Sequence, residues 1–103
     1  MFMLSAISES LGLPSKYINE VYDDYSQDMA CNFYLACPNP EQTLGLPGHS
    51  DPGGLTLLMQ DEVGGMQVLH EDQWVVVRPI PNTLVINLGD QLQVGMSIRC
   101  LAF

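Results

Sequence analysis

Two side chains that could bind a metal ion stand two positions apart in a loop rich in glycine and proline. They are His49 and Asp51, and their loop, residues 45–54, opens onto an apolar run at residues 55–59. In extended backbone, side chains at i and i+2 leave the same face, so the imidazole and the carboxylate can converge on one ion. A histidine nitrogen and a carboxylate oxygen are two of the three ligands in the facial triad of non-haem Fe(II) sites. The spacing therefore predicts part of a metal centre.

The same residues also allow other interpretations. Asp51 precedes Pro52 and could be a turn-forming residue, with His49 an ordinary loop residue. A zinc site formed by Cys31, Cys37 and His49 is a further alternative, although the spacing of the two cysteines suits no common zinc module. The other histidine of the chain, His70, lies where a surface hairpin turn is expected.

The elements that must position this motif fall into two kinds. Residues 1–25 have helical periodicity, and a turn signal at residues 12–14 (Gly-Leu-Pro) divides them into two helices. After this turn an apolar stripe recurs at intervals of three and four, formed by Tyr17, Ile18, Val21, Tyr22 and Tyr25. The sequence thus predicts a helical lead-in.

From residue 29 onward, short apolar runs alternate with glycine and proline, which is typical of a β-sandwich or barrel. The segment His70–Gln73 joins two such runs at hairpin length. We expect strands at residues 29–35, 55–60, 66–69, 74–77 and 83–88. The pattern predicts helices packed on an antiparallel sheet, with no boundary between independent domains.

Composition narrows the class of protein and its partners. The 103 residues are 47% hydrophobic and only 15% charged, which excludes a disordered chain. A net charge of -9 provides no basic surface for nucleic acid or for an anionic membrane. The three cysteines are an odd number at irregular spacing, and no stretch reads as a secretory signal or a membrane span. We therefore expect a cytoplasmic protein.

Several stretches closely resemble plant 2-oxoglutarate- and Fe(II)-dependent dioxygenases. They are residues 32–41, 44–58, 65–69, 79–82 and 87–93, in the order found in that family, and the resemblance runs from about residue 5 to 94. The most similar branch contains anthocyanidin synthase, flavonol synthase and jasmonate-oxidising enzymes. The resemblance implies a mainly β fold with N-terminal helices, a partial double-stranded β-helix (jelly roll) with an incomplete barrel. It divides the chain into a helical lead-in at 1–28, the N-terminal half of the dioxygenase core at 29–94, and a divergent tail at 95–103.

The resemblance also implies roles for four residues. His49 and Asp51 match the first two iron ligands, while Asn32 and Tyr34 match an Asn-x-Tyr pair that lies against 2-oxoglutarate. No catalytic residue is implied beyond the metal ligands. The implied cofactor is Fe(II), with 2-oxoglutarate as co-substrate and a role for ascorbate left open. The implied substrate is a small organic metabolite such as a flavonoid or a hormone.

The chain departs from the family pattern after Val94. The family's second histidine ligand and its Arg-x-Ser motif, which grips 2-oxoglutarate, are not present in matching context, and Arg99 stands one residue out of phase. We therefore expect a C-terminally truncated dioxygenase with weak or no activity as this chain. The alternative is a non-catalytic isoform that associates with, or regulates, an intact relative.

Overall fold

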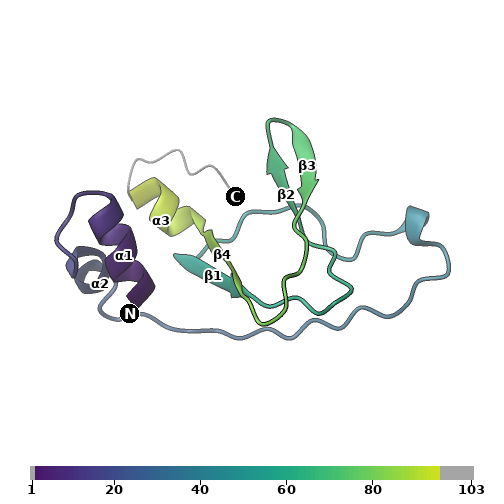
Figure 1. Cartoon of the computed structure of the whole chain (residues 1–103), viewed down its shortest axis with the longest axis horizontal. Coiled ribbons are helices and arrows are strands. Elements are labelled where there is room, and N and C mark those ends of the chain that lie inside the picture. The colour runs from purple at the N-terminus through teal and green to yellow at the C-terminus, as the bar shows by residue number, and fades with distance from the viewer. Residues whose placement is uncertain (1, 96–103) are drawn as a thin grey trace. The chain divides into compact units, whose positions relative to one another are not determined.

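The structure is a computed structural model that describes residues 2–95 of the chain. It divides into two compact units, residues 1–39 and residues 40–103. The first contains helices α1 and α2, and the second contains all four strands and helix α3 (Figure 1). The division at residues 28 and 94 expected from the sequence stays a prediction, and residues 96–103 of the expected tail lie outside the described residues.

The first unit begins with the two predicted helices, α1 (Phe2–Ser10) and α2 (Tyr17–Val21). Helix α1 ends where expected, because Gly12 adopts a positive φ of 72° and its N–H donates to the Glu9 carbonyl at 3.0 Å. Glycine tolerates this left-handed conformation, which closes many helix C-termini. The prediction of two helices separated by a turn is confirmed.

A buried serine joins these helices. The Ser8 hydroxyl donates to the Leu4 carbonyl at 2.8 Å and accepts the Ile18 N–H at 3.2 Å. Leu4 and Ile18 are the buried apolar side chains beside it. Of the apolar stripe expected here, only Ile18 is fully buried, whereas Tyr17, Val21 and Tyr25 are exposed. The packing of α1 on α2 therefore centres on Leu4, Ser8 and Ile18, and a 2.9 Å hydrogen bond from Asn19 to the Ser5 hydroxyl also joins the two helices.

The strand expected at residues 29–35 is not formed, so this prediction is wrong for the described structure. Residues 25–39 contain no helix or strand, and all of them are exposed. A strand is defined by backbone hydrogen bonds to a neighbour, and each described strand pairs only within the second unit. The apolar run therefore has the composition of a strand but no sheet to join.

The second unit contains two antiparallel strand pairs. Strands β1 (Leu55–Leu58) and β4 (Val85–Leu88) pair with Thr56 opposite Asn87. Strands β2 (Gln67–His70) and β3 (Gln73–Val76) form the predicted hairpin, and the turn residues Glu71 and Asp72 both have positive φ, as a two-residue type I′ turn requires. The short helix η1 (Pro40–Gln42) precedes these strands and α3 (Asp90–Gly95) follows them.

The predicted fold class is thus confirmed in part. The strands are four residues each, and in residues 2–95 they form sheets of two strands and no closed barrel. The largest fully buried apolar side chain belongs to Leu92 of α3. None of the helices in the described part has the length and apolar character needed to cross a membrane.

Candidate metal centre

His49 and Asp51 lie side by side in the loop that precedes β1. The His49 Nε2 and Asp51 Oδ1 atoms are 3.4 Å apart, with the imidazole half-exposed and the carboxylate 26% exposed. The other ring nitrogen of His49, Nδ1, is 2.8 Å from the Pro47 carbonyl oxygen. That oxygen only accepts hydrogen bonds, so Nδ1 is the donor in this contact and Nε2 is the ring nitrogen that faces Asp51. Metal-binding histidines are commonly oriented by such a hydrogen bond.

The second oxygen of Asp51 is held from the strands. The Asn87 side-chain amide donates to Oδ2 at 2.9 Å. This bond, a hydrogen bond from Thr56 and the neighbouring His49 lower the pKa of Asp51, and partial burial opposes them without reversing the direction. Asp51 is therefore a carboxylate at neutral pH, which is the form that binds a cation.

The β1–β4 pairing explains why these groups meet. Thr56 and Asn87 are directly opposite each other in the register, and side chains of opposed residues share a face of the sheet. Both therefore reach the same carboxylate. Each is a polar residue in an otherwise apolar strand.

Backbone hydrogen bonds fix residues 49–54, which we call the ligand loop, to the start of α3. The N–H groups of Gly89, Asp90 and Gln91 donate to the carbonyls of Gly54, Asp51 and Gly53 at 2.8, 2.8 and 3.2 Å. The Ser50 hydroxyl adds a 2.8 Å bond to the Asp90 carboxylate. The ligand loop is thus held by main-chain and side-chain contacts together, although most of its residues are exposed.

The donor atoms of this pair fit a divalent transition metal. One imidazole nitrogen and one carboxylate oxygen face each other, and both have their remaining polar atoms engaged elsewhere. Nitrogen and oxygen donors of this kind suit Fe(II). Among residues 2–95, no group of three His, Cys, Asp or Glu side chains could hold a metal. The assignment of His49 and Asp51 as ligands stays a prediction.

The other predicted site residues lie in the first unit. Asn32 and Tyr34 are both exposed and belong to the stretch that forms no strand. Their predicted contact with 2-oxoglutarate stays a prediction. Cys31 and Cys37, the cysteines of the zinc alternative, are exposed free thiols, and His70 is exposed at the end of β2.

Sequence reasoning missed the residues that support Asp51. It gave Thr56 no chemical role and did not single out Asn87 as a partner. A signal was present, since an asparagine in the middle of a run of apolar strand residues needs a hydrogen-bond partner if its side chain is to leave water. Naming that partner required the register of β1 with β4.

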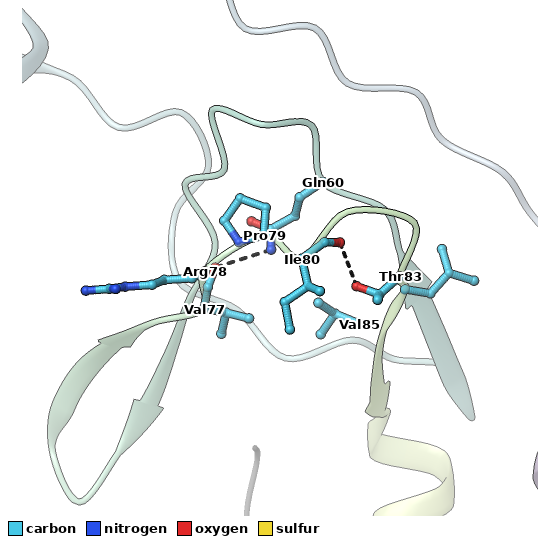
Figure 2. A pocket seen from close by; sticks show the side chains of 8 residues that line it. Gln60, Val77, Arg78, Pro79, Ile80, Thr83 and Val85 are labelled. Atoms are coloured by element: carbon cyan, nitrogen blue, oxygen red, sulfur yellow. Dashed lines mark hydrogen bonds between the residues drawn. The ribbon is translucent and has the colours of Figure 1, made fainter.

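A shallow pocket lies elsewhere in the second unit. It measures about 220 Å³ and its lining consists of Gln60, Val77, Arg78, Pro79, Ile80, Thr83, Leu84 and Val85. The Gln60 amide donates to the Val77 carbonyl at 3.3 Å, and the Thr83 hydroxyl donates to the Ile80 carbonyl at 2.9 Å (Figure 2). The Arg78 side chain extends away from the other lining residues (Figure 2). These polar groups are thus occupied within the chain, and neither His49 nor Asp51 lines the pocket.

Comparison with known proteins places this chain in a family. Residues 25–99 match the 2OG-Fe(II) oxygenase superfamily, so the chain belongs to that family. It is 55% identical over 92 residues to DMR6-like oxygenase 1 of Arabidopsis thaliana, covering 89% of this chain and 26% of that protein. It is 54% identical over 92 residues to flavanone 3-dioxygenase 2 of Oryza sativa subsp. japonica, covering 88% and 27%. The chain thus spans about a quarter of the length of these relatives.

Solved structures are similar as well. The crystal structure of JOX2 in complex with 2OG, Fe and JA matches with a TM-score of 0.77 at 37% identity, covering 90% of this chain and 28% of JOX2. The crystal structure of a full-length Neurospora crassa protein in complex with alpha-KG matches with a TM-score of 0.66 at 25% identity, covering 89% and 32%. The predicted family, its enzyme class, and Fe(II) and 2-oxoglutarate as the cofactors of that family are confirmed.

Proposed function

We propose that the His49–Asp51 pair binds Fe(II) in an oxygenase that uses 2-oxoglutarate to oxidise a small plant metabolite, of the flavonoid or hormone class. The observation that carries this proposal is the 3.4 Å approach of His49 Nε2 to Asp51 Oδ1. The substrate class is supported by the relative named flavanone 3-dioxygenase 2 and by JOX2, whose crystal holds JA. A third ligand comes from outside residues 2–95.

Bound Fe(II) supplies oxygen activation coupled to the oxidation of 2-oxoglutarate. The residues of this chain bind and orient. The Pro47 carbonyl fixes the ring of His49 through Nδ1, and the negative charge of Asp51 offsets part of the charge of the cation. In the first unit, the Tyr34 hydroxyl is a hydrogen-bond donor on a rigid ring, suited to a carboxylate of 2-oxoglutarate.

Metal titration tests this proposal. We expect the chain to bind Co(II), used as an air-stable substitute for Fe(II), and expect His49→Ala and Asp51→Ala to weaken binding by more than the roughly 10–100-fold that loss of a supporting residue costs. The matched control is His70→Ala, which removes the other histidine. Equal Co(II) affinity in wild type, His49→Ala and Asp51→Ala, measured by calorimetry, would refute the proposed centre.

Turnover is a separate measurement. With only the two proposed ligands, His49 and Asp51, we expect little conversion of 2-oxoglutarate to succinate by the chain alone. Two ligands hold the metal less firmly than the three of a complete facial triad. Succinate formation at the rate of an intact family member, abolished by His49→Ala, would show that the chain completes its own site.

A second candidate function is association with an intact relative of the same family. It is favoured by Leu57 and Ile86, which are directly opposite each other on β1 and β4 and are both nearly half-exposed. Side chains alternate along a strand, so this apolar pair is on the face opposite Thr56 and Asn87. Co-purification with a full-length relative, lost in Leu57→Glu, would support association. A chain that stays monomeric and is not retained would count against it.

We also propose a cytoplasmic location. Exposed free thiols at Cys31 and Cys37 suit a reducing compartment. Fractionation of cells that express a tagged chain tests this location, and recovery in the secreted or organellar fraction would contradict it.

A further inference from the structure

Asn87 bonds to one oxygen of Asp51, and the other oxygen lies toward His49. Its side-chain amide donates to Oδ2 at 2.9 Å, while Oδ1 faces His49 Nε2 at 3.4 Å. We propose that Asn87 is a positioning residue that fixes the rotation of the Asp51 carboxylate and so determines which oxygen binds the metal. This inference rests on the proposed function, because it requires that the His49–Asp51 pair is a metal centre.

The Asp51 carboxylate needs a hydrogen bond that restricts its rotation. The last torsion of an aspartate side chain is broad rather than confined to sharp rotamers, so an unsupported carboxylate turns both oxygens toward a cation. A hydrogen bond to Oδ2 restricts that rotation. The main-chain bond from Asp90 to the Asp51 carbonyl holds the backbone but leaves this torsion free.

Asn87 can restrict the rotation of Asp51 because the position of Asn87 is itself determined by the sheet. It is part of β4, paired with Thr56 of β1, and its side chain is half-buried. Two residues later the chain is tied again to the ligand loop, where Gly89 donates to the Gly54 carbonyl at 2.8 Å. The amide thus approaches Asp51 from a segment anchored on both sides, and it adds no charge to the centre.

The test compares Co(II) binding by the full chain and by Asn87→Leu, which is similar in size but cannot donate. We expect roughly a 10–100-fold loss of Co(II) affinity, together with a changed visible absorption spectrum of the Co(II)-saturated protein. The control is Gln67→Ala, which removes an exposed amide from β2 and leaves both readouts unchanged. Unaltered affinity and spectrum in Asn87→Leu would overturn the proposal.

A merely structural role gives a different result. In that case Asn87→Leu lowers the urea midpoint of the metal-free chain, but the variant saturated with Co(II) keeps the wild-type absorption spectrum. This combination of results also overturns the proposal. Should Asn87→Leu fail to fold, the test uses the wild-type chain. The NMR signals of the Asn87 side-chain amide shift on addition of Zn(II) if the proposal holds, and they do not shift if it fails.

His49→Ala separates this inference from the proposed function. Metal binding that is lost in His49→Ala and kept in Asn87→Leu refutes the role of Asn87 alone. An absence of metal binding in the wild type, or binding indifferent to His49→Ala, refutes the centre itself and the role of Asn87 with it.

Discussion

Gly89 lies against the carbonyl group of Gly53, with no room for a side chain between them. A Cβ at position 89 would overlap the Gly53 oxygen and lie 2.9 Å from the Asp51 carbonyl oxygen. The φ angle at Gly89 is not in the left-handed region, so space rather than backbone conformation requires glycine here. This close approach lets the N–H group of Gly89 and those of the first two residues of α3 reach the ligand loop.

We therefore expect Gly89→Ala to destabilise the chain by about 1–3 kcal/mol, the usual cost of forcing atoms into a packed site. The measurement is urea unfolding followed by far-UV circular dichroism. Gly53→Ala is the matched control, since a Cβ there meets nothing within 4 Å. Equal urea midpoints for the two variants would contradict the close contact.

Trp74 gives an optical probe of the centre. Its ring lies next to Gly48, where a Cβ would be 2.8 Å from the ring atom Cη2, and residue 48 directly precedes His49. Trp74 is the single tryptophan of the chain, so tryptophan fluorescence reports only on the surroundings of residue 48. We expect Co(II) to quench the fluorescence of the wild-type chain and to leave that of His49→Ala unchanged. Quenching of equal extent in both would show that the metal binds elsewhere.

The buried hydroxyl of Ser8 can be tested in the first unit. Ser8→Ala leaves the Ile18 N–H without its acceptor, and an unsatisfied buried donor costs about 1–3 kcal/mol. Thermal unfolding of the helices should therefore occur at a lower temperature. Ser10→Ala is the control, because the Ser10 hydroxyl makes a comparable bond, to the Ile7 carbonyl, at an exposed position. A wild-type melting temperature in Ser8→Ala would contradict the assigned role of Ser8.

The lowered pKa of Asp51 predicts a dependence of stability on pH. Because the hydrogen bond from Asn87 first, and then that from Thr56, favours the charged form in the folded chain, Asp51 contributes stability that is present in full above its unfolded pKa. That contribution declines as the pH falls from about 4 through the lowered folded pKa. We expect the difference in unfolding free energy between wild type and Asp51→Asn to shrink on acidification over this range. A difference that stays constant from about pH 6 to about pH 3 would rule this out.

Local patterns predicted the parts of the fold that local interactions form. The helix end at Gly12 follows from a residue that tolerates positive φ, and the hairpin turn at Glu71 and Asp72 follows from the length of the connection between two strand-forming runs. The proximity of His49 and Asp51 follows from their spacing in extended backbone, because no other segment is needed to bring them together.

The rest depends on pairing between distant segments, which no local pattern records. The run at residues 29–35 has strand composition but no partner among the described strands. The shared role of Thr56 and Asn87 depends on one register, and a slip of β4 by one residue would turn Asn87 away from Asp51. The family resemblance named the two predicted ligands, His49 and Asp51, but not these supporting residues.

The bond between Asp51 and Asn87 has a consequence for the order of folding. These residues are 36 positions apart, and the β2–β3 hairpin lies within the intervening chain. The hairpin closes a two-residue turn, whereas β1–β4 pairing must first overcome the entropy of a far longer loop. We therefore expect the hairpin to form early and to shorten the loop that β1–β4 pairing must close, so that Asn87 reaches Asp51 only in the last stages of assembly.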